Sequence, residues 1–117
     1  MFVLDPAANE IDEYTLSTGF DIESTVSYVR SLNIGSEETT PTSIAFDPTG
    51  TTLFVVGQQN DRVHEYVLTT GYDITTAIFV EQKSPSNSLT RPYGITFNGD
   101  GTKLYIAENH QGGVNSY

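Results

Sequence analysis

The residues of this chain that could do chemistry are polar side chains in short segments between apolar runs. Carboxylates, amides and guanidinium groups bind ligands by hydrogen bonds and charge, and hard oxygen ligands suit calcium. We expect the ligand-binding residues among Asp5, Asn60, Asp61, Arg62, Arg91, Glu108, Asn109 and His110. The alternative is that these segments are solvated loops under little packing constraint.

Sequence signatures of covalent catalysis and of phosphate binding are absent. The chain has no Cys, no G-x-S-x-G motif and no Gly-rich phosphate loop. The run from Asn98 to Gly101 (NGDG) lacks the later acidic ligands of a calcium loop, so it predicts a turn. His110 could be a general base only with a partner that the sequence does not identify, and we expect both His64 and His110 to be exposed. We therefore predict no catalytic residues, and a protein that is not an enzyme is favoured.

The balance of charge excludes some partners. Fifteen acidic and five basic residues give a net charge of −10, which argues against binding to nucleic acid and to anionic membrane surfaces. No apolar run is long enough to span a bilayer. The acidity could attract a divalent cation such as calcium, but a solvated acidic surface is the commoner explanation, and we predict no dedicated metal site. The compartment stays open; an extracellular, cell-surface or virion location of a parent protein is compatible with the sequence.

The polar segments lie between runs that recur every 51 or 52 residues. Residues 11–22 (IDEYTLSTGFDI) match residues 63–74 (VHEYVLTTGYDI) at an offset of 52, and residues 41–56 match residues 92–107 at an offset of 51. The match continues through turns as well as strands, which chance composition does not explain. The many Tyr, Phe, Val, Ile and Thr residues favour strands. We therefore expect an all-β fold built from one repeated unit.

Each repeat predicts four short strands. They are expected over residues 42–46, 52–56, 62–68 and 77–82, with the fourth strand of the preceding copy over residues 26–32. In the turn from Asp47 to Gly50, Pro48 presets φ and Gly50 supplies a positive φ. Residues 53–56 are apolar on both faces, which predicts a strand covered on both sides. Four antiparallel strands with two buried faces are typical of a β-propeller blade. An immunoglobulin-like sandwich is the alternative, but it would not repeat at this spacing.

The loops at one end of the predicted strands differ between the copies of the repeat, whereas the turns at the other end are conserved between them. The loops over residues 5–10, 36–40, 57–62, 84–91 and 108–113 vary between copies, whereas the turns STGFDI and TTGYDI stay alike. Variation over a constant scaffold is how loops carry function, so we expect any site on the variable end. The recurring aromatic residues are expected to be core or blade-contact residues first and sugar-binding platforms only distantly; they are Tyr14, Tyr66, Tyr117, Phe20 and Tyr72.

These residues also resemble a known family. The run P-x-x-I-x-F-x-x-x-G-x-x-L-F/Y-V/I, followed by V-x-x-Y-x-L-S/T-T-G-F/Y-D-I, is similar to the β-propeller repeats of the YVTN and NHL-like type, especially those of marine bacteria and phages. The resemblance covers essentially the whole chain. It implies propeller blades but not a function, because propellers of this kind include lactonases, gluconolactonase-like enzymes, adhesive surface proteins and scaffolds.

The resemblance implies an incomplete ring. Residues 1–35 would be a partial blade without its innermost strand, 41–83 a complete blade, and 91–117 a partial blade without its outermost strand. The strands would number three, four and three. Exposed apolar blade faces are rare in soluble monomers, so we expect a fragment that closes its ring as a homo-oligomer, with a trimer favoured over a dimer.

Three functions remain open. The preferred one is a non-enzymatic repeat module that acts as a binding or interaction scaffold for a protein or glycan. The second is part of a metal-dependent lactonase; related propeller enzymes hold a divalent ion with Glu, Asn and Asp from different blades, which implies the candidate ligands Asp5, Asn60, Asp61, Glu108 and Asn109. The third is a carbohydrate-binding surface protein.

Overall fold

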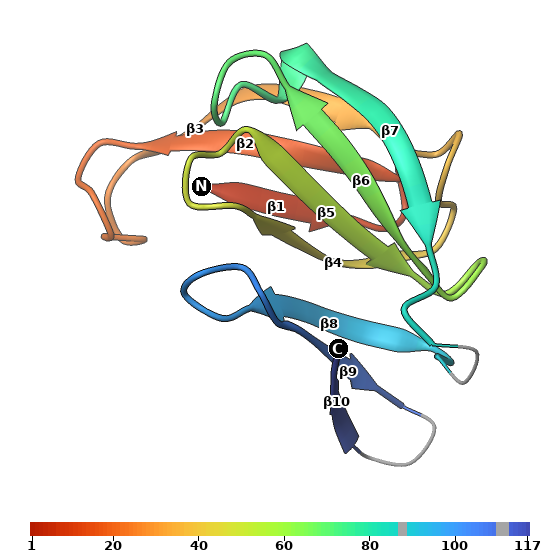
Figure 1. Ribbon diagram of the computed structural model, residues 1–117. Helices are drawn as coiled ribbons and strands as arrows, with labels where there is room; N and C mark the ends of the chain where they lie inside the picture. Colours follow the sequence, from red (N-terminus) through yellow and green to blue (C-terminus); the bar gives the residue numbers. More distant parts are fainter. Residues whose placement is uncertain (87–88, 110–112) are drawn as a thin grey trace.

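The protein consists of three small antiparallel sheets (Figure 1). The computed structural model describes residues 1–86, 89–109 and 113–117. The first sheet contains β1 (Phe2–Asp5), β2 (Glu10–Leu16) and β3 (Val26–Asn33); the second contains β4 (Pro41–Phe46), β5 (Thr52–Gly57), β6 (Arg62–Leu68) and β7 (Ala77–Lys83), with a short 3₁₀ helix, η1 (Ile74–Thr76), before β7; the third contains β8 (Pro92–Phe97), β9 (Leu104–Glu108) and β10 (Gly113–Ser116). None of the three sheets closes into a barrel or ring within this part of the chain.

The strands lie where the sequence predicts them. The all-β class is confirmed, and the described residues form three, four and three strands in the three sheets. The predicted strand bounds differ from those of β3 to β7 by at most one residue. Gly50 and Gly101 both have a φ of 72°, so the β4–β5 and β8–β9 turns place glycine where a side chain would be strained. These two turns therefore determine where β4 and β8 end and where β5 and β9 begin.

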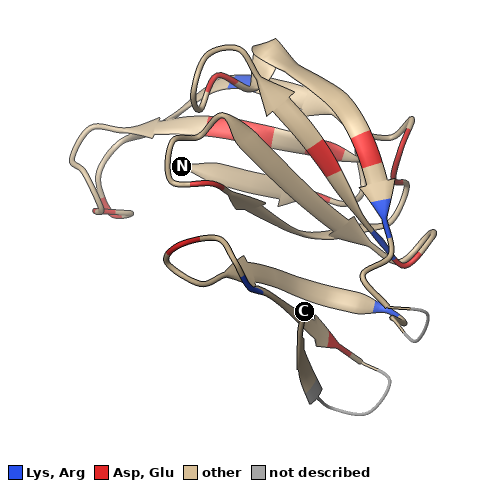
Figure 2. Ribbon diagram, viewed as in Figure 1, with Lys and Arg blue, Asp and Glu red and all other residues tan. Residues whose placement is uncertain are grey.

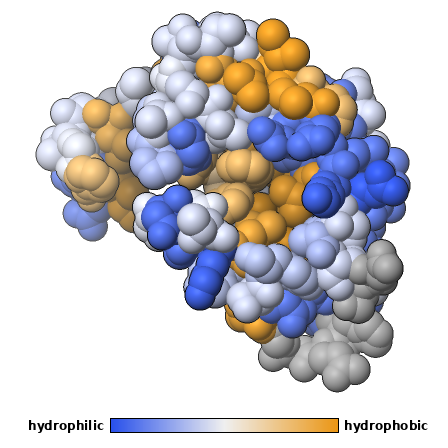
Figure 3. Space-filling view, viewed as in Figure 1, coloured by the Kyte–Doolittle hydropathy of each residue, from blue (hydrophilic) through white to orange (hydrophobic). Residues whose placement is uncertain are grey.

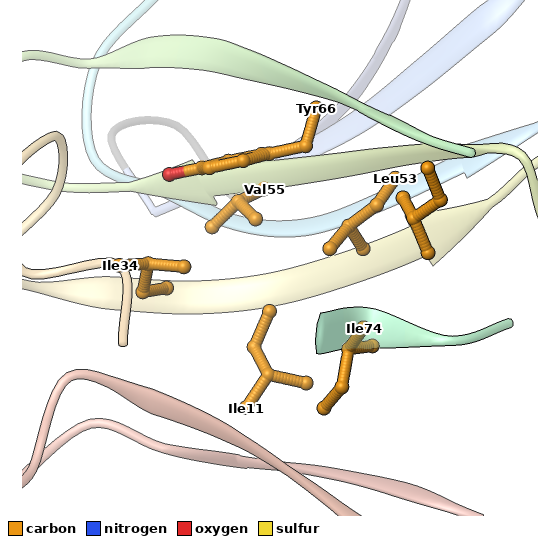
Figure 4. Close-up of a cluster of buried hydrophobic side chains, with 7 residues drawn as sticks. Ile11, Ile34, Leu53, Val55, Tyr66 and Ile74 are labelled. Carbon is orange, nitrogen blue, oxygen red and sulfur yellow. The ribbon is translucent and has the colours of Figure 1, made fainter. Parts of the chain in front are cut away.

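The main hydrophobic core lies between the first and second sheets (Figure 4). Alternation along β6 points His64, Tyr66 and Leu68 toward one side, where they are buried. The core residues come from both sheets and from the segments that follow β3 and β6, and they are Ile11, Ile34, Leu53, Val55, Tyr66, Leu68 and Ile74. An ion pair adds a polar link between the same sheets, since Arg30 lies 2.6 Å from both Glu13 and Asp73.

The third sheet packs on the opposite face of the second. The rings of Phe54 and Phe97 lie 4.6 Å apart across this interface, and the Thr42 hydroxyl donates a hydrogen bond of 2.7 Å to the Pro92 carbonyl. Leu53 and Val56 are fully buried although they point to opposite faces of β5. The prediction that this strand is covered on both sides is therefore confirmed.

The outer faces of the first and third sheets carry exposed apolar side chains. Val3 and Tyr28 are exposed on the first sheet, and Val114 is exposed on the third. Phe20 is fully exposed in the β2–β3 turn, which projects from the body of the molecule (Figure 1). The prediction that Phe20 is a core or blade-contact residue is therefore wrong within this chain, because no described residue covers it. No helix in the described residues is long and apolar enough to cross a membrane.

Candidate functional site

The predicted site residues come from corresponding ends of the strands. Asp5 ends β1 and Glu108 ends β9, while Arg62 begins β6 and Arg91 precedes β8. Asn60 and Asp61 lie in the β5–β6 turn, and Asn109 follows β9. His110 lies outside the described residues. Charged positions occur around this loop end and over the strands of the second sheet (Figure 2).

Asp61 and Arg91 join the second sheet to the third. The Asp61 carboxylate accepts a hydrogen bond of 2.7 Å from the Arg91 backbone N–H. Both residues have a positive φ, 51° for Asp61 and 50° for Arg91, a conformation that costs energy for residues other than glycine. The Arg91 carbonyl in turn accepts from the Asn109 N–H at 3.3 Å. Loops from two sheets are therefore held in one arrangement at this end.

The side chains around this junction can offer an exposed binding surface. Tyr93 is half exposed, and the Asn109 amide donates to its hydroxyl at 3.4 Å. Among the described residues, the guanidinium groups of Arg62 and Arg91 form no ion pair within 4.0 Å. The structure thus places an aromatic ring, an amide and two exposed arginines on the loop end of the second and third sheets.

Asp5 and Glu108 instead stabilise their own sheets. The Asp5 carboxylate caps the β1–β2 turn by accepting from the N–H groups of Ala7 and Ala8 at 2.9 and 3.1 Å. The Glu108 carboxylate accepts hydrogen bonds from the Thr90 N–H, the Asn115 amide and the Tyr117 hydroxyl. Within the described residues, Asp5 has no hydrogen bond to the other predicted site residues. Asn60 is exposed.

The candidate calcium ligands do not form a metal centre in the described part of the chain. No three His, Asp or Glu side chains there lie close enough together to hold an ion. Asp5, Asp61 and Glu108 belong to three different sheets, and each carboxylate already accepts hydrogen bonds from the protein. These carboxylates are therefore not gathered, in the described residues, into the divalent-ion site that the resemblance implies. The predicted lack of a dedicated metal site and the possible attraction of a cation such as calcium both stay predictions.

A buried polar pair was missed by the sequence reasoning. Glu38 turns inward from the β3–β4 loop, and its Oε2 lies 3.4 Å from His64 Nε2 with both side chains fully buried. The Glu38 Oε1 accepts hydrogen bonds from the N–H groups of Thr40 and Gln59 at 2.7 and 3.2 Å. The expectation that His64 is exposed is therefore wrong. The strand alternation His64, Tyr66, Leu68 is the signal that could have predicted its burial.

Burial shifts the pKa values of His64 and Tyr66. It lowers the pKa of His64 below its ordinary value, while Glu38 and Glu37 oppose that shift. Burial also raises the pKa of Tyr66 far above its usual range, aided by Glu37, which accepts a hydrogen bond of 3.2 Å from the Tyr66 hydroxyl. Neither His64 nor Glu38 can reach a dissolved substrate from this position, so the pair contributes to stability and to its pH dependence.

Two cavities lie between the second and third sheets, away from the predicted site residues. The first, of about 400 Å³, opens beside the β4–β5 and β8–β9 turns and is lined by Phe54, Phe97, Tyr72 and turn residues. The second, of about 360 Å³, includes Val63, Glu65, Lys83 and Tyr117 in its lining. Figure 3 shows apolar surface between the upper part of the molecule and the third sheet.

The comparisons with known proteins show the fold alone. No protein-family model matches the chain, and no curated protein matches its sequence. Solved structures match 96–99% of the chain at 10–15% identity. They are a putative 6-phosphogluconolactonase of Bacteroides fragilis (TM-score 0.66, 10% identity), another of Bacteroides uniformis (TM-score 0.68, 11% identity) and a functionally unknown protein of Desulfotomaculum acetoxidans (TM-score 0.61, 15% identity). The chain covers 30%, 32% and 35% of these proteins, so it has the fold of about a third of each.

Proposed function

We propose that the three sheets are successive blades of a β-propeller of the YVTN or NHL-like type. Support comes from equivalent positions in the first two sheets, which are 52 residues apart. Val55 is fully buried and Tyr66 nearly so where the second sheet meets the first, whereas their counterparts Val3 and Tyr14 retain exposure on the outer face of the first sheet. That face therefore has the composition of a blade contact and needs a further blade to cover it.

The propeller acts as a non-enzymatic binding scaffold through its loop end. The observation that carries this proposal is the hydrogen bond from the Arg91 backbone to the Asp61 carboxylate, which fixes the loops of two sheets together. A fixed loop surface binds with a smaller loss of conformational entropy than a mobile one. The exposed ring of Tyr93 beside the Asn109 amide suits a saccharide, since the ring offers an apolar face and the amide offers hydrogen bonds. Glycans are therefore the first ligand class to test.

A glycan array with the purified chain tests this surface. We expect the wild-type chain to bind at least one glycan, Tyr93→Ala to bind it at least tenfold more weakly, and Tyr93→Phe to keep most of the affinity. Thr69→Ala is the matched control, because Thr69 is exposed at the opposite end of the second sheet. Failure of the wild-type chain to bind any glycan, or full binding by Tyr93→Ala, would contradict the proposed surface.

Lactone hydrolysis is the second candidate, favoured by the two structural neighbours named as putative 6-phosphogluconolactonases. Their shared fold with this chain covers only about a third of their length. The binding-scaffold proposal predicts that the chain does not accelerate the opening of 6-phosphogluconolactone or glucono-δ-lactone above the buffer rate. An acceleration that Asp61→Asn and Glu108→Gln both abolish would favour the hydrolase instead.

A further inference from the structure

Two aromatic turns in this chain have the same conformation but different surroundings. Phe20 in the β2–β3 turn and Tyr72 in the β6–β7 turn are 52 residues apart, and their φ angles are 60° and 61°. Both turns also share backbone hydrogen bonds, from Asp21 N–H to the Thr18 carbonyl and from Asp73 N–H to the Thr70 carbonyl. A positive φ is uncommon for a bulky residue and costs energy.

Tyr72 shows what such a turn does. Its ring lies on Gly50 so closely that a Cβ at Gly50 would be 2.3 Å from it. The ring centroid lies 5.4 Å from that of Phe46, at a tilt, and 6.4 Å from that of Phe2, on which it stacks. The Tyr72 N–H donates to the Gly50 carbonyl at 2.9 Å, and its hydroxyl donates to the Pro48 carbonyl at 3.1 Å. The aromatic turn therefore covers both the β4–β5 turn and the aromatic pair between the first and second sheets.

The third sheet has the receptor for such a turn but no cover within the described residues. The β8–β9 turn repeats the β4–β5 turn: Gly101 has the same φ as Gly50 and donates to Asn98 as Gly50 donates to Asp47, both at 3.0 Å. The pair Phe54–Phe97, at 4.6 Å, repeats the pair Phe2–Phe46, at 4.7 Å. A Cβ at Gly101 would meet nothing within 4 Å. The cavity of about 400 Å³ lies here, lined by Phe54, Phe97 and Gly101 among others.

We propose that the Phe20 turn of one copy of this chain docks into the cavity beside Gly101 of a second copy. This inference rests on the proposed propeller and names its partner as a second copy. Phe20 takes the position over Gly101 and Phe97 that Tyr72 takes over Gly50 and Phe46. The backbone N–H of Phe20 donates to the Gly101 carbonyl of the second copy, as the Tyr72 N–H donates to Gly50. The exposed Phe20 turn and the uncovered β8–β9 turn could thus form between two copies the contact that Tyr72 and Gly50 form within one chain.

Docking requires an exchange of strands. The Tyr72 turn follows β6, which pairs with β5, so the Phe20 turn must bring β2 to the place that β10 holds beside β9. Residues 1–14 correspond to residues 104–117 at an offset of 103, which lets β1–β2 replace β9–β10. Ile95, which pairs with Ile106 in one chain, then pairs with Val3 of the second copy. The result is a four-stranded sheet made of β8 from one copy and β1–β3 from the other.

Because Asn109 follows β9, the exchange also separates Asn109 from Tyr93. The loop surface proposed for glycans therefore belongs to the single chain, and glycan binding should compete with assembly.

Two substitutions separate docking from folding. Gly19 has open space around it, whereas a Cβ at its counterpart Gly71 would lie 2.4 Å from the Thr49 carbonyl. Gly19→Ala therefore leaves a single chain unstrained but introduces the same collision with the β8–β9 turn of a docked partner. Phe20→Ala removes the ring, and Phe20→Tyr supplies the side chain found at position 72. Because Phe20 is fully exposed, neither change at this residue disturbs the single chain.

The association state of the full chain tests the proposal. In sedimentation equilibrium, we expect wild type and Phe20→Tyr to form species that are multiples of 12.8 kDa, while Phe20→Ala and Gly19→Ala associate at least tenfold more weakly. A wild-type chain that stays monomeric at every concentration overturns the proposal. So does wild-type association by either Phe20→Ala or Gly19→Ala.

Two further measurements keep the test independent of folding and of the proposed function. The chain contains no Trp, so the fluorescence of the Phe20→Trp variant comes from position 20 alone. Its tryptophan emission should shift to shorter wavelength as the protein concentration rises. Adding Gly19→Ala to this variant should abolish the shift. In hydrogen exchange, β9–β10 amides should exchange faster in the assembled chain than in Gly19→Ala, and unchanged or slower exchange overturns the strand exchange. A chain that binds glycan yet stays monomeric in its absence refutes this inference alone, whereas one that assembles while its Gly19→Ala variant binds no glycan refutes only the proposed loop surface.

Discussion

Glu38 Oε2 lies 3.4 Å from His64 Nε2 in the interior between the first and second sheets, and neither side chain is exposed. Burial disfavours the charged imidazole more than the neighbouring carboxylate favours it, so the pKa of His64 is below its ordinary value. The folded chain consequently binds fewer protons at this site than the unfolded chain near pH 6.

Stability should therefore fall as the pH is lowered through about 6.5, the pKa of an unfolded histidine. One proton gives a slope of at most about 1.4 kcal/mol per pH unit, and the loss ends below the folded-state pKa. Urea unfolding from pH 8 to pH 5 measures it. His64→Gln, which cannot titrate but can donate to Glu38, should flatten the slope. Asp100 does not affect this slope: hydrogen bonds from Thr102 lower its pKa, so the stability that its carboxylate contributes is lost only below about pH 4. A slope unchanged in His64→Gln would contradict this assignment.

The closeness of Glu38 to Gly57 predicts a steric effect. A Cβ at Gly57 would lie 2.2 Å from the Glu38 Cδ, inside a region with no exposed surface. Gly57→Ala should lower the free energy of unfolding by about 1–3 kcal/mol, because the carboxylate must move away from its hydrogen bonds. Gly94→Ala is the matched control, since its Cβ would make only an ordinary contact of 3.5 Å with Ala107. Equal denaturation midpoints for the two variants would refute the explanation.

Tyr72 and Phe20 should respond differently to truncation in the monomer. Tyr72→Ala loses the ring over Gly50 and the hydrogen bond to Pro48, which should cost about 1–2 kcal/mol for a partly exposed side chain. Phe20→Ala should change the stability by less than about 0.5 kcal/mol. Thermal and urea unfolding at low protein concentration compare them without association. A similar loss for both would mean that Phe20 already has a contact within its own chain.

Arg30 links the first and second sheets through Glu13 and Asp73 at 2.6 Å. Because the guanidinium is partly exposed, Arg30→Met should lower the free energy of unfolding only slightly, and by less in 1 M salt. Arg62→Met is the control, since this arginine forms no ion pair within 4.0 Å among the described residues. Chemical unfolding at low and high salt would show the difference, and a salt-independent loss in Arg30→Met would point to lost packing of the side chain instead.

The positions of the strands could be predicted because several local signals agree. Around β5, the apolar run, the turn with Pro48 and Gly50, and the repeat at 51 residues all indicate the same strand bounds. The β3–β4 loop offers no such pattern. Glu38 turns inward because the Ile34 side chain is buried in the core and the Ile34 carbonyl accepts a hydrogen bond from the Glu38 N–H. That contact depends on the packed sheets, so the sequence could not predict it.

The position of the polar loop residues could be predicted, but their contacts could not. Variable polar loops indicated the loop end, and Asp61 and Arg91 do meet there. Their contact joins residues 30 positions apart through a backbone N–H, which carries no residue-specific signal. Tyr93 was missed because its counterpart, Thr42, is not aromatic, so the repeat gave no reason to single it out.

The second and third sheets each have a carboxylate at the loop end, but it comes from a different segment of the chain in each sheet. In the second sheet the carboxylate belongs to Glu38, in the loop before β4, and it lies against Gly57 at the end of β5. In the third sheet Glu108 occupies the position that corresponds to Gly57, and its carboxylate accepts a hydrogen bond from the Thr90 N–H. Recombination between repeats would therefore be tolerated only when the loop and the strand end are inherited together. A crossover between them would leave two acids in one space, or none.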